Sequence, residues 1–336
     1  MRYVDVLYGP VDIDEPVLLD LMASDALDRL RGVTQHGVTA LLGITPPFTR
    51  FDHSVGAMLL VRRLGASLEE QIGALLHDVS HTAFSHVIDF VFDDHSSQSY
   101  HEEKKPDFLA ASDVPDILRR HGRDWQDFID ETRFSLLEQD MPALCADRLD
   151  YFLRDLEFLD LATGADIRAA LEALAVQDGR IVVADADNAR WLAYTFIEVD
   201  RASWSSVREV GLYQLAAEAI KAAVRTGAVS ETDYWGSDET LWSRLRAAEH
   251  PEVRQWLELL CPGTRFVADS AHPHFRVSPK VRSIDPPVLA NGIVSPLSAL
   301  DPAFAAYRAD YLAAKRGELA MAVVGAPVAD IEPRIG

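Results

Sequence analysis

The chain of 336 residues has few cysteines, few basic residues and no long apolar run. Its two cysteines, Cys145 and Cys261, argue against a disulfide framework, so we expect the reducing environment of the cytoplasm. No apolar stretch approaches the roughly 20 residues that a transmembrane helix needs. Residues 1–10 lack the basic start and apolar segment of a signal peptide. We therefore expect no membrane partner.

The charge balance is strongly acidic, with 32 lysines and arginines against 53 aspartates and glutamates and a formal net charge of −21. A surface this negative repels polyphosphate backbones over long range. It argues against duplex nucleic acid as a partner, but it allows a small nucleotide in a locally basic pocket. Assembly into a homo-oligomer is left open.

Apolar residues at helical spacing predict a mainly α-helical fold with small β-hairpins and a mixed α+β C-terminal part. Turn signals predict hairpins around Gly9-Pro10 and Asp178-Gly179. Residues 226–238 are polar and rich in turn formers. We therefore expect a core domain at residues 1–225 and a helical and β subdomain at residues 226–336, packed on the core. The expected helices are residues 26–36, 50–64, 67–78, 83–92, 142–159, 188–225, 239–260 and 303–316.

Six of the eleven histidines lie between residues 50 and 101, at positions 53, 77, 81, 86, 95 and 101. Histidine is the commonest metal ligand and exchanges protons near neutral pH. Taken singly, each of these histidines is more often a core or surface group. Together, His53, the adjacent pair His77 and Asp78, and Asp147 offer nitrogen and oxygen donors from separate segments. That set favours divalent Mn, Fe, Co, Ni or Zn, and suits Mg less because Mg prefers oxygen.

Several ordered motifs surround these donors: R-F-x-H-S-x-G at residues 50–56, H-D-x-x-H-x-x-F-S-H at 77–86, H-E at 101–102 and D-x-x-D-Y-x-x-R-D at 147–155. This order resembles the HD superfamily of metal-dependent phosphohydrolases. The wider pattern, which includes Arg29-Leu30-Arg31 and Gln35, is similar to the deoxynucleotide triphosphohydrolase branch. The resemblance covers about residues 3–160 and implies an HD-domain fold that hydrolyses nucleotides.

The resemblance also implies roles for individual residues. A metal-activated water attacks phosphate in such enzymes, with histidines assisting proton transfer. The implied metal ligands are His53, His77, Asp78 and Asp147, and the implied phosphate-binding residues are Arg50 and Arg148. The implied catalytic residues are His81, His101 with its neighbour Glu102, and Asp89, which would orient one of the two histidines. Gln35, Tyr151 and Asp155 would contact the sugar, with His36 in the pocket wall beside them.

Two departures from the branch bear on the substrate. His36 stands where the branch usually has leucine, which alters the pocket wall near the sugar. Residues 195–208 keep only Arg201 and Arg208 where the branch has a basic cluster for the distal phosphates. The sequence therefore predicts a shift toward nucleoside mono- or diphosphates, unless Arg201, Arg208, Lys280 or Arg282 enters the pocket.

Two alternatives belong to other functional classes. One is a non-catalytic nucleotide sensor or scaffold, against which the complete ligand set and both catalytic histidines count. The other is an HD nuclease on single-stranded nucleic acid, against which the acidic charge and the lack of a basic-aromatic stripe count. We therefore predict a cytoplasmic, metal-dependent nucleotide phosphohydrolase.

Overall fold

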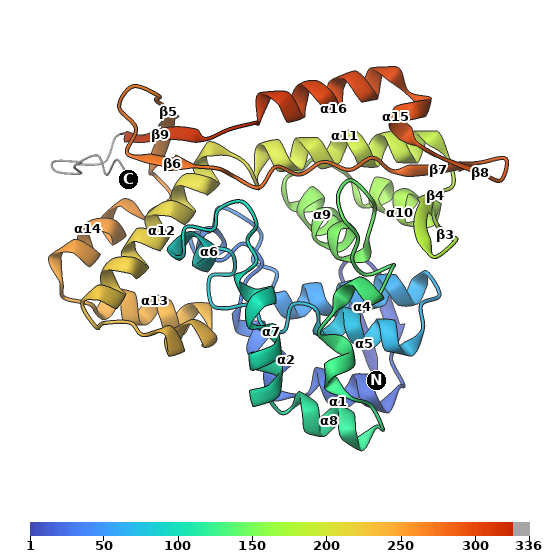
Figure 1. The fold of residues 1–336 in the computed structure, drawn as a ribbon, viewed down its shortest axis with the longest axis horizontal. Coiled ribbons are helices and arrows are strands. Elements are labelled where there is room, and N and C mark those ends of the chain that lie inside the picture. The colour runs from blue at the N-terminus through green and yellow to red at the C-terminus, as the bar shows by residue number, and fades with distance from the viewer. Residues whose placement is uncertain (325–336) are drawn as a thin grey trace.

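A computed structural model describes residues 1–324, which form a mainly helical molecule with small sheets, as predicted (Figure 1). None of the described helices is long and apolar enough to cross a membrane.

The α-helices are α1 (Pro16–Met22), α2 (Asp25–Asp28), α3 (Val38–Leu41), α4 (Arg50–Arg63), α5 (Leu68–Leu76), α6 (Val87–Val91), α7 (Tyr100–Ala111), α8 (Val114–Arg120), α9 (Ala146–Phe158), α10 (Gly164–Ala173), α11 (Ala186–Ala202), α12 (Val207–Arg225), α13 (Asp238–Ala247), α14 (Pro251–Leu259), α15 (Leu297–Leu300) and α16 (Pro302–Ala314). Short 3-10 helices are η1 (Arg29–Gly32), η2 (Trp125–Phe128), η3 (Glu131–Arg133) and η4 (Glu231–Trp235).

The strands form three small sheets among the described residues. Both predicted hairpins are present, and Asp178 and Gly179 have the positive φ angles, 51° and 73°, that a tight two-residue turn requires. Strand β4 also pairs in parallel with β7, so the second hairpin is extended by a strand from much later in the chain. The sheets are β1 (Arg2–Asp5) with β2 (Gly9–Asp12); β3 (Leu174–Gln177), β4 (Arg180–Val183), β7 (Pro287–Ala290) and β8 (Ile293–Pro296); and β5 (Arg265–Ala268), β9 (Leu319–Val324) and β6 (Phe275–Val277).

Two hydrophobic clusters make up the core. The first is centred on α4, α5, α9 and α11, and the second on α6, α12, α13 and α14 with strands β6 and β9. Ile284, Val288 and Phe304, from late in the chain, return to the first cluster. The division expected at residue 225 is therefore not a division of the core, because α12 packs with the helices that follow it.

The helix expected at residues 188–225 is two helices, α11 and α12, which meet at an angle in Figure 1. The helix is interrupted at residues 203–206. The Ser206 hydroxyl then accepts a hydrogen bond from the Glu209 amide and caps α12. The pattern Ser-x-x-Glu at 206–209 is typical of a helix start. The break brings Trp204 to the central cavity.

The helix expected at residues 83–92 is confined to α6, because Phe84 and Ser85 have positive φ angles of 63° and 50°. Tertiary hydrogen bonds hold this irregular backbone: the Ala83 amide donates to the Tyr234 carbonyl, and the Phe84 amide donates to Asp238. The bend directs the following histidine toward the cavity.

Candidate active site

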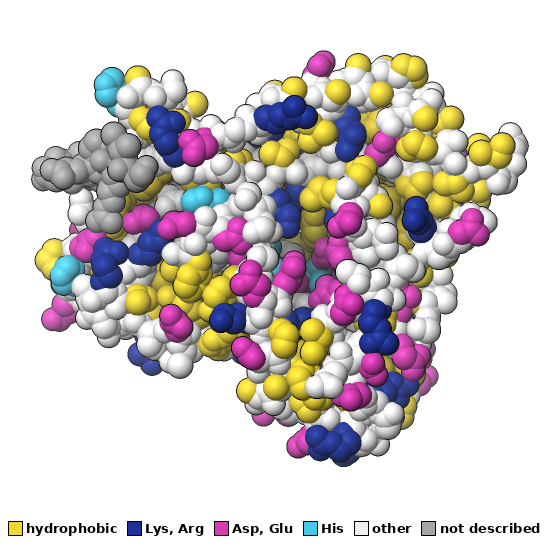
Figure 2. Space-filling model, viewed as in Figure 1, with side chains coloured by type: hydrophobic (Ala, Val, Ile, Leu, Met, Phe, Trp, Pro, Cys, Tyr) yellow, Lys and Arg dark blue, Asp and Glu magenta, His cyan; other side chains and the backbone are white. Residues whose placement is uncertain are grey.

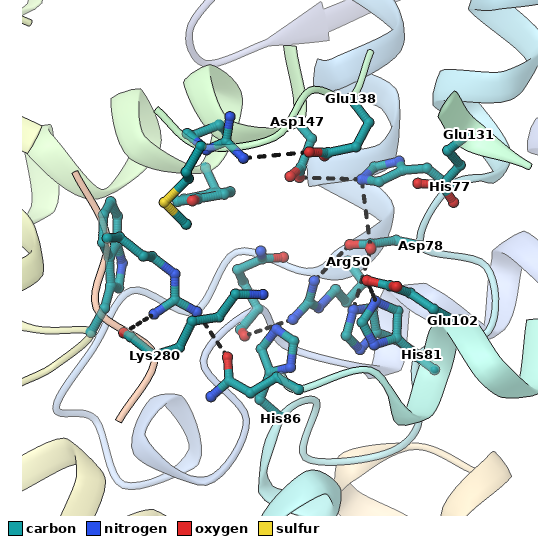
Figure 3. Close-up of a pocket in the computed structure, with 18 of the residues that line it drawn as sticks. Arg50, His77, Asp78, His81, His86, Glu102, Glu131, Glu138, Asp147 and Lys280 are labelled. Carbon is teal, nitrogen blue, oxygen red and sulfur yellow. Dashed lines mark hydrogen bonds and ion pairs between the residues drawn. The ribbon is translucent and has the colours of Figure 1, made fainter. Parts of the chain in front are cut away.

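Three helix ends bring the four predicted metal ligands together, and Figure 3 shows three of them, His77, Asp78 and Asp147. His53 lies in the first turn of α4, which a capping box of Thr49 and Asp52 fixes in place. His77 is the C-cap of α5, and Asp78 follows where the helix has ended. Asp147 lies in the first turn of α9. The chain turn after α5 is what allows adjacent residues to face one centre.

The donor atoms of these residues converge at short distances. His53 Nε2 lies 3.2 Å from His77 Nε2, and Asp147 Oδ1 lies 2.9 Å from the former and 3.4 Å from the latter. Asp78 completes the group, with its oxygens 3.7 Å from His53 Nε2 and 3.6 Å from His77 Nε2. His53 is completely buried. The sequence-predicted ligands thus share one centre.

The partners of the other ring nitrogens show that this donor set fits a divalent metal. His53 Nδ1 donates to Asp150 at 2.8 Å, and His77 Nδ1 donates to the Ala74 carbonyl at 2.7 Å. Both acceptors place the proton on Nδ1, so the two Nε2 lone pairs face each other. Such lone pairs, beside two carboxylates, need a cation between them, and outer carboxylate or carbonyl acceptors are usual for metal-binding histidines.

The electrostatics of the centre agree with a bound cation. Burial by itself lowers the pKa of His77, but the carboxylates of Asp78 and Asp147 outweigh it and raise that pKa to about 10. Burial by itself raises the pKa of Asp147, yet hydrogen bonds from His53 and His77 hold it well below its ordinary value. A divalent metal would replace the protons that this centre otherwise attracts.

The two arginines predicted to bind phosphate line the cavity but are already engaged. Arg50 Nη1 donates to Asp78 at 2.6 Å, and its Nε donates to Ser85 at 3.1 Å. Arg148 donates from Nη1 to the Ala143 carbonyl at 2.7 Å and from Nη2 to Glu138 at 3.4 Å. Both side chains are buried. They are therefore oriented by protein groups, and Arg50 holds a metal ligand in place.

The predicted catalytic histidines lie directly beside the metal ligands. The rings of His81 and His101 stack with centroids 3.7 Å apart, and His81 Nε2 is 3.2 Å from an Asp78 oxygen. Burial lowers the pKa of His81 to about 3, and burial also holds the pKa of His101 well below its ordinary value. Glu102 sits at the edge of the site, largely exposed and 4.0 Å from His101.

Asp89 has a different partner from the one predicted. Its carboxylate accepts from His86 Nδ1 at 3.0 Å and from the Tyr100 amide at 3.0 Å; no hydrogen bond to His81 or His101 occurs in the described part of the chain. His86 packs edge-on against both of those rings, at 5.0 and 5.5 Å. The expectation that Asp89 orients His81 or His101 is thus corrected to His86. The spacing His86-x-x-Asp89 was the available signal.

The wall predicted to contact the sugar is built around Asp155. One carboxylate oxygen lies 2.7 Å from His36 Nε2, and the other accepts from Trp204 Nε1 at 2.7 Å. Both oxygens therefore have a partner within the protein, and the predicted contact with a sugar stays a prediction. Gln35 and Tyr151 line the same cavity, and the Gln35 Oε1 atom has no partner among the described residues.

Apart from the buried His53 and Asp89, the predicted site residues line one cavity of about 490 Å³, visible as a central hollow ringed by acidic side chains in Figure 2. Lys280 and Arg282 enter it from the segment between β6 and β7, where they donate to the Ser97 carbonyl and the Gln98 side chain. Arg201 and Arg208 stay outside: Arg201 pairs with Glu198 at 3.1 Å, and Arg208 donates to the Pro262 carbonyl. Two of the four cations considered from sequence therefore reach the site.

Comparison with known proteins identifies the family. Residues 50–155 match the HD domain model. The chain is 38% identical over 92% of its length, and 91% of the relative's, to a protein of Cordyceps militaris named metal-dependent phosphohydrolase cns2. The chain belongs to the HD-domain metal-dependent phosphohydrolases. A Bacillus subtilis relative, the uncharacterized protein YdhJ, is also 38% identical, over 86% of this chain and 88% of its own.

More distant matches are found both among named proteins and among solved structures. A Dictyostelium discoideum protein named deoxynucleoside triphosphate triphosphohydrolase SAMHD1 homolog is 24% identical over 53% of this chain and 40% of its own. The fold is shared with a crystal structure of a Bacteroides thetaiotaomicron phosphohydrolase, at a TM-score of 0.72, 16% identity and coverage of 96% of this chain and 98% of the other. A hypothetical Aquifex aeolicus protein gives a TM-score of 0.69, at 19% identity and coverage of 91% and 93%.

The HD match contains the metal donors but only part of the cavity. His36 lies before it, and Trp204, Glu209, Lys280 and Arg282 lie after it. The end of the cavity with the predicted metal ligands is therefore built from the HD segment, whereas much of the remaining wall comes from residues before and after it.

Proposed function

We propose that this HD phosphohydrolase acts on nucleotides, and that nucleoside mono- or diphosphates suit it better than triphosphates. The observation that carries the proposal is the layout of the cavity. His77, Asp78 and Asp147, which contact the buried His53, lie at one part of its wall with three further histidines, whereas the aromatic rings of Tyr151 and Trp204 and the cations Lys280 and Arg282 line other parts. A phosphate at the metal and an aromatic base further along would match that layout.

The chain's own residues divide the reaction between them. A divalent metal at His53, His77, Asp78 and Asp147 would supply a nucleophilic water and offset charge on phosphate oxygens. Arg50 holds Asp78 in position through its 2.6 Å hydrogen bond. As the water oxygen bonds to phosphorus it gives up a proton, and as the ester bond breaks the leaving oxygen takes one up. Because burial keeps His81 and His101 neutral, such a ring would first accept the water proton and then pass it to the leaving oxygen. We assign that transfer to the cluster of His81, His101 and His86, the last oriented by Asp89.

The charge of the cavity supports a substrate with few phosphates. Carboxylates outnumber cations along its wall, and Arg50, Arg148 and Lys105 each pair with a carboxylate. Lys280 and Arg282 have only uncharged hydrogen-bond partners among the described residues. Because the carboxylates of Asp78 and Asp147 already offset the charge of a divalent metal, Lys280 and Arg282 would leave part of the charge of a triphosphate unpaired, and burying unpaired charge costs several kcal/mol.

A substrate screen tests this proposal. Purified protein would be stripped of metal, reloaded with Mn, Fe, Co, Ni, Zn or Mg, and given nucleoside mono-, di- and triphosphates. We expect metal-dependent release of inorganic phosphate, with higher kcat/KM for the mono- or diphosphates. Release of tripolyphosphate as the dominant product would contradict the phosphate preference. Tight nucleotide binding without any release would favour the sensor, and cleavage of single strands alone would favour the nuclease.

A further inference from the structure

Trp204 is a half-buried aromatic residue that lines the cavity from outside the HD segment. It lies in the break between α11 and α12, where the backbone is not helical. Because the helix is interrupted between α11 and α12, the indole of Trp204 lies against the cavity and not on the apolar face of a helix. No role in phosphate chemistry accounts for it, because it carries neither a charge nor a proton that exchanges near neutral pH.

The indole is held in a fixed orientation. Its Nε1–H donates to Asp155 at 2.7 Å, and the ring packs edge-on against Phe196 with centroids 5.0 Å apart. Asp155 is in turn held by His36 on its other oxygen, also at 2.7 Å. Asp155 and His36 are both buried, so this network keeps one geometry. An aromatic side chain fixed in this way is a preformed surface for another ring.

A row of rings connects this surface with the metal centre. The ring of His53 lies 6.1 Å from that of Tyr151, and Tyr151 lies 5.1 Å from Trp204, both in edge-on contact. A ligand whose phosphate sits at the metal donors and which extends along Tyr151 therefore reaches Trp204 with its far end. In a nucleotide that far end is the base, with the sugar between.

Arg282 adds a cation near the same ring. Its guanidinium carbon lies 5.9 Å from the Trp204 ring, at the outer limit of a cation–π contact. Its side chain also donates a hydrogen bond to Gln98, another residue of the cavity lining, at 2.9 Å. The contact between Arg282 and Trp204 is therefore weak. A planar ring of a ligand can replace Arg282 in contact with the indole, and Arg282 can then lie beside that ring.

We propose that Trp204 is the platform on which the base of the substrate stacks, and that Asp155 is a positioning residue that holds it there. The placement of the phosphate at the metal rests on the proposed function. Stacking on aromatic side chains tolerates every base, because every base has a π face. We therefore expect a broad base range, with stronger binding of the larger purines.

The test compares nucleoside 5′-monophosphates with ribose 5-phosphate, which has the phosphate and sugar but no base. In the wild-type protein, kcat/KM should favour the nucleotides at least tenfold. Trp204→Leu should reduce that advantage by about tenfold, mainly through KM, whereas Trp204→Phe should keep most of it. Trp191→Phe is the matched control, because Trp191 lies on α11 and outside the cavity lining. An unchanged ratio in Trp204→Leu would overturn the proposal.

A binding measurement separates this inference from the proposed function. Nucleoside monophosphates stacked on Trp204 should quench its fluorescence, and the quench should vanish in Trp204→Phe but persist in Trp191→Phe. If neither substrate is hydrolysed and this pattern still appears, the platform stands and the phosphatase assignment falls. If nucleotides cause no quench, or the quench survives in Trp204→Phe, the platform is wrong even where hydrolysis occurs. Asp155→Asn should weaken the quench and raise KM for nucleotides more than for ribose 5-phosphate.

Discussion

The Nε2 atoms of His53 and His77 lie 3.2 Å apart, and the Nδ1 atom of each ring faces a hydrogen-bond acceptor, which leaves both Nε2 atoms for a shared cation. Asp150 and the Ala74 carbonyl are these acceptors, on the opposite side of each ring. This arrangement indicates a metal site, because two Nε2 atoms that face each other in a buried, acidic centre are stabilised by a cation between them. Asp150 also accepts from Arg154, so its position is fixed from a second direction.

Asp150→Asn should weaken metal binding without removing a ligand. The variant keeps an oxygen near His53 Nδ1 but loses the negative charge that strengthens the ring as a donor. Losses of outer partners of this kind typically cost about 10–100-fold in metal affinity. Competition against a metal indicator measures the effect. Arg154→Lys is the control, since it disturbs the other side of Asp150; an equal loss of affinity there would point to a purely structural role for Asp150.

His86→Ala and His101→Ala should separate turnover from metal binding. Neither residue is one of the four proposed ligands, and both lie in the neutral histidine cluster beside them. We expect full metal content and a fall in kcat of about 10²–10⁴-fold, as for groups that transfer protons. Elemental analysis and initial rates on the same preparations test this. Loss of metal from either variant would make that histidine a ligand instead.

Asp89→Asn should change how stability depends on pH. Burial raises the pKa of Asp89 from 3.8 to about 6 in the folded protein. Since the folded value is the higher one, ionising Asp89 costs stability; that cost is absent below about pH 4 and complete above about pH 6. Between these limits the free energy of unfolding of the wild type should fall, relative to Asp89→Asn, by about 3 kcal/mol.

Urea unfolding at pH 4, 5, 6 and 7 measures this difference, with the exposed Asp116→Asn as control. The variant should also lose activity, because His86 would lose its charged partner. A constant difference in stability across these pH values would show that Asp89 does not carry this cost.

The late segment between β6 and β7 should contribute to phosphate binding through its two cations. Lys280→Gln and Arg282→Gln should each raise KM for nucleotides, more for diphosphates and triphosphates than for monophosphates, and by about tenfold or more in the double variant. Arg201→Gln and Arg208→Gln are matched controls, because both arginines lie outside the cavity lining. Equal effects in the controls would indicate long-range charge rather than contact.

The metal donors were within reach of sequence reasoning because His53, the His77 and Asp78 pair, and Asp147 each occupy a motif position at a helix end. Helix positions also followed from apolar periodicity, as for α4 and α9. The helices followed from local patterns, since capping and apolar spacing act over a few residues, whereas the donor roles followed from the ordered motifs that resemble the HD superfamily.

The other half of the cavity was not predictable in the same way. Trp204 reaches it only because the chain breaks between α11 and α12, and Arg282 only because the segment after β6 crosses the mouth. Asp89 was assigned to the wrong histidine because three rings crowd the same place and spacing alone does not choose among them. Such contacts depend on packing between distant segments, which periodicity does not encode.

The most direct test of the central claim is metal content and phosphate release measured together on wild type, His77→Ala and Asp147→Ala. The exposed His272→Ala serves as the control for loss of a histidine. We predict that the wild type and His272→Ala hold a stoichiometric divalent metal and release phosphate from nucleotides, and that His77→Ala and Asp147→Ala lose both. Retention of metal and activity in the two site variants would contradict the assignment of this centre as the metal-dependent phosphohydrolase site.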